Sequence, residues 1–146
     1  MAETPMTIRV TRTVEFSSAH RLYREDLSDS ENLEIFGLCA NPNGHGHNYQ
    51  LEVTVEGPLD PQSQMVVHFN QLKSLLEETV SLPLDHKNLN LDVPFLKGKI
   101  PTSEVLCVEL WKEISRNIPS SVPWRLKRLR LGASTKNWVE YEGPNQ

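Results

Sequence analysis

Hydrophobic and polar positions alternate along the first part of the chain, which is typical of strands with one buried face. The alternation covers residues 8–20, interrupted only by Arg12, and returns over residues 46–57. The segment between them, residues 24–43, is polar and rich in turn-forming residues, so we predict a loop there. Two long half-buried strands are therefore expected in this part of the chain.

The spacing of apolar residues then changes from two to about 3.6, the period of a helix. It predicts a helix over residues 71–81, with Asn70 as its N-cap. Residues 83–101 have no regular pattern and carry several prolines and asparagines, so we predict a long loop.

A second helix is predicted to open at the sequence PTSE, where Thr102 or Ser103 can cap it, and to continue to Ile118. Residues 126–134 and 138–142 then read as two strands joined by a tight turn. The predicted order is β-β-α-α-β-β. This is an α+β plan, with both helices on one face of an antiparallel sheet.

Composition narrows the classes of function. The 146 residues are 38% hydrophobic, without a break in composition, so we predict one globular domain over residues 1–146. No apolar run reaches the roughly 18 residues of a membrane span, and no signal-like segment opens the chain, so a cytoplasmic location is expected. Cys39 and Cys107 are then predicted to be free thiols. The net charge is −4 and the sequence contains no strongly basic segment, which argues against nucleic acid or an anionic membrane as the main binding partner and favours a small-molecule ligand.

The stretch FGLCANPNGHGHNY combines a turn with candidate chemistry. NPNG is a turn sequence, because proline fixes φ and asparagine or glycine accepts positive φ. His45 and His47 lie two residues apart at the start of a strand and share its apolar face, and His20 ends the first strand on its apolar parity. Three converging imidazoles with an open fourth position are typical of catalytic zinc. The alternative is a set of hydrogen-bonded core histidines.

Four segments, in this order, closely resemble the 6-pyruvoyltetrahydropterin synthase family: FSSAHRL, FGLCANPNGHGHNY, PLDHKNLN and PTSE. The resemblance extends over about residues 10–141. It implies the tunnelling fold (T-fold), in which three β-β-α-α-β-β subunits form a closed β-barrel. It also implies a homohexamer made of two trimers, with active sites between subunits.

The resemblance further implies a carbon–oxygen lyase that converts 7,8-dihydroneopterin triphosphate to 6-pyruvoyltetrahydropterin, in tetrahydrobiopterin biosynthesis, and releases triphosphate. Zinc would act as a Lewis acid on the side-chain oxygens, and a thiolate and an imidazole would move protons between carbons. The site residues that the resemblance implies are the Zn²⁺ ligands His20, His45 and His47, the catalytic residues Cys39, Asp85 and His86, and the substrate-binding residues Thr102, Ser103, Glu104 and Ala133.

Ala133 is a departure from the family pattern, which has at this position a glutamate that binds the pterin ring. Its absence predicts weaker binding, because charge-assisted hydrogen bonds contribute about 1.5–3 kcal/mol each. His68 stands where the family usually has Asp or Asn, and we interpret it as a capping or surface residue. Which of Arg21, Arg24 and Lys87 meets the triphosphate is left open by the sequence.

Two alternative functions follow from the same residues. One is 6-carboxytetrahydropterin synthase, which shares the zinc site, although the five residues between Cys39 and His45 favour the pyruvoyl-forming branch. The other is a noncatalytic, zinc-containing pterin-binding protein, which the substitution at Ala133 supports.

Overall fold

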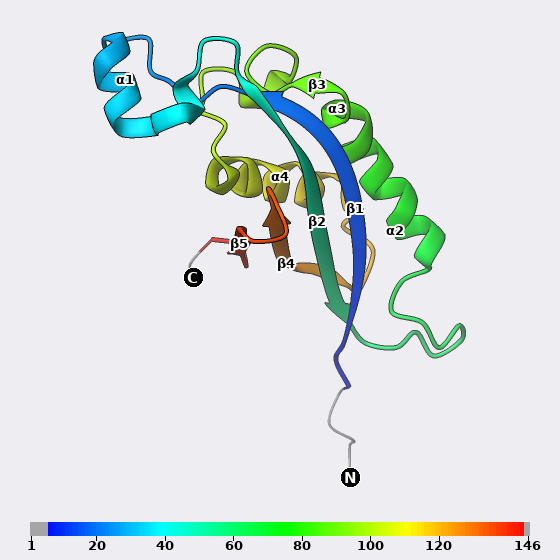
Figure 1. Cartoon of the computed structure of the whole chain (residues 1–146). Helices are drawn as coiled ribbons and strands as arrows, with labels where there is room; N and C mark the ends of the chain where they lie inside the picture. Colours follow the sequence, from blue (N-terminus) through cyan, green and yellow to red (C-terminus); the bar gives the residue numbers. More distant parts are fainter. Residues whose placement is uncertain (1–5, 145–146) are drawn as a thin grey trace.

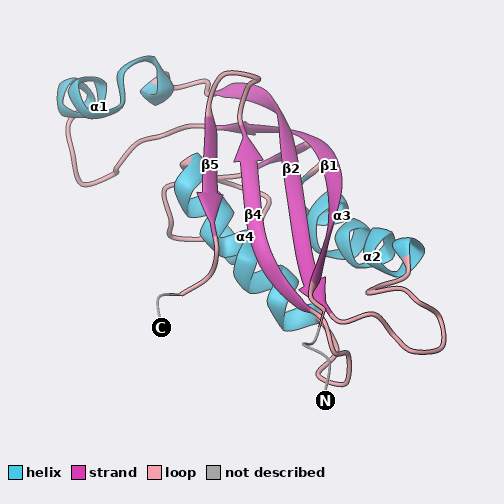
Figure 2. Cartoon of the chain, turned by 90° about the horizontal axis from the view of Figure 1, so that it is seen from below, coloured by secondary structure: helices cyan, strands magenta, loops and turns pink. Residues whose placement is uncertain are grey.

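The structure is a computed structural model, and it describes residues 6–144. One five-stranded sheet, in the order β3-β1-β2-β4-β5, forms its centre. Helices cover one face of the sheet, and no helix within residues 6–144 covers the other face (Figures 1 and 2). The strands are β1 (Ile8–His20), β2 (His45–Gly57), β3 (Lys87–Asn88), β4 (Arg125–Gly132) and β5 (Trp138–Tyr141). The helices are α1 (Asp29–Phe36), α2 (Phe69–Leu76), α3 (Leu82–Leu84) and α4 (Ser103–Asn117).

The long hairpin of β1 and β2 sets the register of the molecule. The two strands pair antiparallel from Ile8 opposite Gly57 to His20 opposite His45. β4 pairs antiparallel with β2, and β5 with β4. Because the hairpin is continuous over its whole length, it places the end of β1 directly against the beginning of β2.

The core lies between the sheet and the helices. Tyr49, Leu51 and Val53 on β2 are fully buried, as are Leu106 and Leu110 on α4. Each such apolar side chain contributes roughly 1.5–3 kcal/mol when it is removed from water. The alternation predicted for the first two strands and the apolar face predicted for the second helix are therefore confirmed. None of the helices within residues 6–144 is apolar over a stretch long enough to cross a membrane.

The prediction of a loop over residues 24–43 was wrong, because α1 and a 3₁₀ turn (Gly37–Ala40) lie within it. Ser28 caps α1 by accepting from the Glu31 N–H, and the Glu31 side chain accepts from the Ser28 N–H, which makes a capping box. Of the three apolar residues of this helix, Leu33 and Ile35 are exposed and Phe36 is only partly buried. Without a buried stripe the helix has no periodic signal in the sequence.

The first predicted helix also differs from the structure at both ends. Its N-cap is His68, whose Nδ1 accepts from the Asn70 N–H at 3.1 Å, so the assignment of Asn70 as N-cap was wrong. After α2 the chain makes a π-helical turn (Glu77–Ser81) and continues through α3. The π turn accommodates Pro83, whose ring cannot follow an α-helical turn and whose nitrogen carries no hydrogen.

The segment predicted as a loop over residues 83–101 contains a short strand. β3 pairs in parallel with β1 at Ser18 and Ala19, so the sheet has five strands where the sequence predicted four, and it is not wholly antiparallel. A two-residue strand carries no detectable alternation, which is why the pattern missed it. The remaining ends agree with the prediction to within two residues, and Thr102 is the N-cap of α4.

Candidate metal centre

Three histidines converge at the end of the β1–β2 pair where residues 21–44 connect the two strands, as the sequence predicted. His20 faces His45 across the two strands, and His47 follows two residues later on the same face of β2. The Nε2 atoms of His20 and His45 are 3.2 Å apart, and those of His45 and His47 are 3.0 Å apart. The candidate ligand atoms of all three lie within 4.8 Å of one another. The hairpin register alone therefore assembles the cluster.

The tautomer of His20 is set by a main-chain carbonyl. Its Nδ1 lies 2.8 Å from the oxygen of Pro101. A carbonyl oxygen can only accept, so Nδ1 carries the proton and Nε2 presents a lone pair to the cluster. Burial lowers the pKa of His20, and the pKa of His47 is also lowered, first by burial and then by His45. Both shifts favour the neutral imidazole, which is the form that binds metal.

These residues fit a zinc ion. Three nitrogens bound to one tetrahedral zinc at its usual bond length would be about 3.3 Å apart, close to the separations of 3.0 and 3.2 Å seen here. Lone pairs that face each other at this distance repel unless a proton or a cation lies between them. A metal ion at the centre of the cluster would satisfy all three imidazoles at once.

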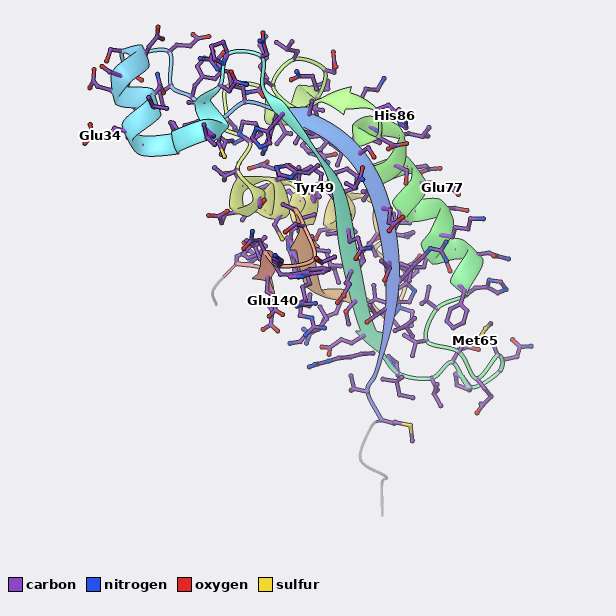
Figure 3. The ribbon with its side chains drawn as sticks, viewed as in Figure 1. Glu34, Tyr49, Met65, Glu77, His86 and Glu140 are labelled. Carbon is purple, nitrogen blue, oxygen red and sulfur yellow. The ribbon has the colours of Figure 1, made fainter. Side chains whose placement is uncertain are left out.

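Tyr49 lies between the histidine cluster and the protein core. It is fully buried, its ring stacks on Phe16, and its hydroxyl lies 3.4 Å from Nδ1 of His20. Burial raises the pKa of the Tyr49 hydroxyl, so the phenol is neutral at physiological pH. In Figure 3 the residue projects from β2 toward α4. It closes the protein side of the site and leaves the opposite side accessible.

Cys39 borders a cavity of about 600 Å³ that also reaches His45. The thiol is free, and its residue is held in place by the Leu22 N–H, which donates to the Cys39 carbonyl at 2.8 Å. Cys107 is also free but lies in the core, where burial raises the pKa of its thiol to about 12. The prediction of two free thiols is confirmed, and only Cys39 is placed where a ligand could reach it.

Asp85 and His86 lie at the outer edge of β1. Asp85 Oδ1 accepts from the Ser17 N–H at 2.8 Å, and its Oδ2 lies 2.9 Å from Nδ1 of His86. The Ser17 N–H and then His86 lower the pKa of Asp85. His86 has a φ of 61°, a conformation that is uncommon outside glycine and asparagine, and 83% of its side chain is exposed. Figure 3 shows it beyond β1, on the edge of the sheet.

Within one chain the structure does not bring Cys39 together with the Asp85–His86 pair. His86 and His47 border a second cavity, of about 530 Å³, that Cys39 does not line. Cys39 and His45 border the first one. The three histidines therefore lie between two cavities, with the thiol in one and the exposed imidazole in the other.

The four residues predicted to bind substrate lie in two places: residues 102–104 at the start of α4, and Ala133 near the histidine cluster. Thr102 uses its hydroxyl to accept from the Val105 N–H at the start of α4, and Glu104 is exposed in the first turn. None of residues 102–104 lines either cavity. Ala133 lies just beyond β4, partly buried, and its main chain is close to the ring of His47. The position of the expected pterin anchor is therefore beside the candidate metal centre.

Sequence reasoning missed two supports of this site. The Pro101 carbonyl orients His20, and the Tyr49 hydroxyl lies beneath the same ring. The parity that Tyr49 shares with His45 and His47 is a signal that could have identified it. No pattern could have identified Pro101, because it acts through its main chain and is 81 residues away from His20.

Comparisons with known proteins agree with this geometry. The profile of the family described as 6-pyruvoyl tetrahydropterin synthase matches residues 9–144. A 6-pyruvoyl tetrahydrobiopterin synthase of Poecilia reticulata is 45% identical over 134 residues, which is 92% of this chain and 89% of that protein. The solved structure of the 6-pyruvoyl tetrahydropterin synthase of Caenorhabditis elegans superposes with a TM-score of 0.88 at 37% identity, covering 97% of this chain and all of that one. A candidate 6-carboxy-5,6,7,8-tetrahydropterin synthase of Archaeoglobus fulgidus is 30% identical over 96 residues, 66% of this chain and 73% of that protein.

Proposed function

The chain belongs to the 6-pyruvoyl tetrahydropterin synthase family, and from this premise we propose that it is a zinc-dependent lyase of pterin biosynthesis. Its substrate is 7,8-dihydroneopterin triphosphate, and its products are 6-pyruvoyltetrahydropterin and triphosphate. The observation that carries the proposal is the three-histidine cluster with an open side, next to a cavity that contains a free thiol. Relatives named as this synthase share over 40% of their residues with the chain along almost its full length.

His20, His45 and His47 would hold the zinc through their Nε2 atoms. When bound, zinc supplies a Lewis acid that acidifies the hydroxyl groups of the substrate side chain and stabilises the enolate. Burial favours the neutral imidazoles of His20 and His47 by lowering their pKa, and the Pro101 carbonyl fixes the ring of His20. The preference for zinc over Mg²⁺ or Ca²⁺ rests on the all-nitrogen donor set.

We assign the proton transfers to Cys39 and His86. The thiolate of Cys39 removes a proton from a side-chain carbon, since a thiol next to a metal loses its own proton readily. Asp85 accepts from Nδ1 of His86 and thereby leaves Nε2 of that ring to exchange a proton with the substrate. The exposure of His86 suits this role, because its partner in the reaction is the substrate and not another residue of the same chain.

The active site is completed between subunits of a homohexamer. Two features support this assembly. Along residues 8–17, β1 pairs only with β2 among the described residues, and β5 pairs only with β4, so the sheet has two free edges that a second copy can cover. In addition, Cys39 and His86 line different cavities of one chain, and a neighbouring copy can bring the His86 of one subunit to the Cys39 of another.

Binding of the pterin ring is weaker here than in a family member with the anchoring glutamate. Ala133 has no polar side chain, and Thr102, Ser103 and Glu104 remain as candidate substrate contacts at the start of α4. A noncatalytic pterin-binding protein is the second candidate function, and Ala133 is the observation that favours it. The 6-carboxy branch is disfavoured, because its relative matches over only 66% of the chain at 30% identity.

We place the protein in the cytoplasm or an equivalent reducing compartment. Cys39 and Cys107 are both free thiols in the structure, and a catalytic thiol would be consumed by oxidation elsewhere.

The deciding experiment is a turnover assay of the zinc-loaded protein with 7,8-dihydroneopterin triphosphate. Release of triphosphate together with formation of 6-pyruvoyltetrahydropterin supports the proposal, and Cys39→Ala should abolish both. Acetaldehyde release would instead assign the 6-carboxy branch. Binding of the pterin without release of triphosphate, in protein with full zinc content, would establish the noncatalytic alternative.

A further inference from the structure

Arg21 is held rigidly beside the candidate metal centre. Its main chain is fixed by Asn90, which accepts from the Arg21 N–H at 2.7 Å and donates to the Arg21 carbonyl at 2.9 Å. Its side chain donates from Nε to the Ala40 carbonyl at 2.9 Å, and the guanidinium lies 4.1 Å above the ring of Tyr23. These contacts use one of the five guanidinium N–H donors. The other four, on the two terminal nitrogens, are available to a ligand.

The charge of Arg21 is not neutralised by a carboxylate. Among residues 6–144, no Asp or Glu oxygen lies within 4.0 Å of its guanidinium nitrogens. Other cations of the same region are paired: Arg24 with Asp26 at 2.6 Å, and Lys99 with Glu109 at 3.3 Å. Arginine left unpaired but immobilised by other contacts is typical of a site for carboxylate or phosphate.

The cavity in front of Arg21 is the one that contains Cys39 and His45. The rest of its wall is mostly apolar or uncharged, and it includes Leu33, Leu38 and Pro42. Asp29, in the first turn of α1, is its single carboxylate, and it makes no ion pair with Arg21. A ligand bound in this cavity, in contact with both Cys39 and the metal centre, therefore lies next to the fixed positive charge of Arg21.

We propose that Arg21 binds the triphosphate group of the substrate and stabilises it as the leaving group. This inference rests on the proposed function and deepens it. Of the three cations that the sequence left open, Arg24 is paired with Asp26 and faces another cavity, and Lys87 lines the cavity of His86. Only Arg21 faces the cavity of the thiol.

The elimination of triphosphate is favoured by a positive charge next to the leaving group. A base of the enzyme removes a proton from the carbon next to the one that bears the triphosphate. The carbon–oxygen bond to triphosphate then breaks with its electron pair, which stays on the leaving oxygen, while the electrons of the broken C–H bond form a carbon–carbon double bond. The negative charge on the leaving group increases as the bond breaks, and the terminal N–H groups of Arg21 donate to it.

The test is a calorimetric titration of zinc-loaded protein with inorganic triphosphate, and in parallel with neopterin, which has no phosphate. Arg21→Gln should weaken triphosphate binding by about tenfold to a hundredfold and change neopterin binding by less than about twofold. Arg21→Lys keeps the positive charge but not the planar guanidinium group with its paired N–H donors, and it should weaken triphosphate binding less than Arg21→Gln. In turnover both variants should lower kcat as well as raise KM.

Two matched variants serve as controls. Asp29→Asn removes the other charge of the same cavity and should leave triphosphate binding unchanged or make it tighter. Lys87→Gln removes a cation from the other cavity and should have little effect. Zinc content and thermal stability are measured for every variant, so that a loss of the metal or of the fold is recognised; if Arg21→Gln does not fold, Arg21→Lys gives the comparison.

Unchanged triphosphate affinity in a folded, zinc-loaded Arg21 variant would overturn the inference. So would loss of binding in Lys87→Gln alone, which would assign the phosphate site to the cavity of His86. Either result can occur in a protein that turns over 7,8-dihydroneopterin triphosphate normally. The inference can therefore fail while the proposed function holds, and binding of triphosphate through Arg21 can be shown in a protein without turnover.

Discussion

Nδ1 of His20 and the main-chain oxygen of Pro101 are joined by a hydrogen bond of 2.8 Å, and this contact links the metal centre to α4. The segment before α4 is anchored on both sides of Pro101. Lys99 forms an ion pair with Glu109 at 3.3 Å, and Thr102 caps the helix at Val105. Burial raises the pKa of Glu109, but its ion pairs with Lys112 and Lys99 outweigh this effect and lower the pKa overall, so Glu109 is ionised. Glu109 and Lys99 thus help to anchor the segment that carries Pro101, the hydrogen-bond partner of His20.

Replacing Glu109 by Gln should weaken zinc binding although this residue does not touch the cluster. Outer contacts of a ligating histidine typically change metal affinity by about tenfold to a hundredfold, and we expect the lower end because Pro101 itself is retained. The measurement is zinc affinity by competition with a chromophoric chelator. The absorption spectrum of the Co²⁺ form should also change.

Three further single variants and one double variant separate this path from general destabilisation. Lys99→Met should reproduce the effect of Glu109→Gln, and the double variant should add little to it. Lys112→Met removes the other partner of the same carboxylate, and Glu113→Gln changes the same helix at a site paired only with Arg116. Both should bind zinc normally. Equal losses in all four variants would mean that the path through Lys99 does not exist.

Each subunit should bind about one zinc ion through the three histidines. His47→Ala should reduce the metal content to a small fraction and lower the thermal stability of the holo-protein to that of the metal-free protein, because bound metal stabilises only the folded state. Elemental analysis after dialysis against a chelator measures this. His68→Ala, which lies on α2, is the control and should retain its zinc. Full zinc content in His47→Ala would contradict the assignment of the ligands.

Ala133→Glu should strengthen pterin binding. The main chain at this position is close to the ring of His47, so a carboxylate there would lie beside the metal centre and could meet two donors of the pterin ring. We expect Kd for neopterin to fall by about tenfold, or roughly 1.4 kcal/mol, with an increase in any turnover. Ala133→Gln has the same size without the charge and should gain less. Lower stability with unchanged affinity would show that Ala133 only packs, with glutamate there a buried unpaired charge.

His68→Asp should stabilise the protein. The imidazole of His68 caps α2, but histidine is not among the preferred N-caps, and an aspartate also interacts favourably with the helix dipole. We expect a gain of about 0.5–1 kcal/mol in the free energy of unfolding, measured by urea denaturation at pH 7. His68→Ala should be less stable than the parent by a similar amount. A destabilised Asp variant would refute the capping role.

Asp85→Asn should lower stability at neutral pH, and the difference from the parent should vanish in acid. The pKa of Asp85 is lowered in the folded protein by the Ser17 N–H and by His86, relative to about 3.9 in an unfolded chain. The ionised carboxylate therefore stabilises the fold above about pH 4, and this contribution is lost as the pH falls through the folded pKa. Denaturation curves of both proteins from neutral pH downward measure it. A pH-independent difference would mean that the charge of Asp85 plays no part.

The strand pattern was sufficient to predict the cluster of three histidines. Alternation in the two long strands predicted which face of each strand is buried. Because side chains in a strand alternate with a period of two, His20, His45 and His47 were predicted to lie on that buried face. The structure adds the register, with His20 opposite His45, which brings the three rings together. The pattern also gave the helix of Cys107 and Leu110, whose apolar stripe is continuous.

The contacts around this cluster could not be predicted from the sequence. The contact of Pro101 with His20, the position of Asp85 against Ser17 and the immobilisation of Arg21 by Asn90 join residues 68 to 81 positions apart, through main-chain atoms that have no sequence signature. The same holds for α1, which is specified by a capping box and not by a buried face, and for the two-residue strand β3. Periodicity reports burial of side chains in regular elements. Loops that contact each other through main-chain atoms are positioned by packing, so their contacts can be identified only in the folded structure.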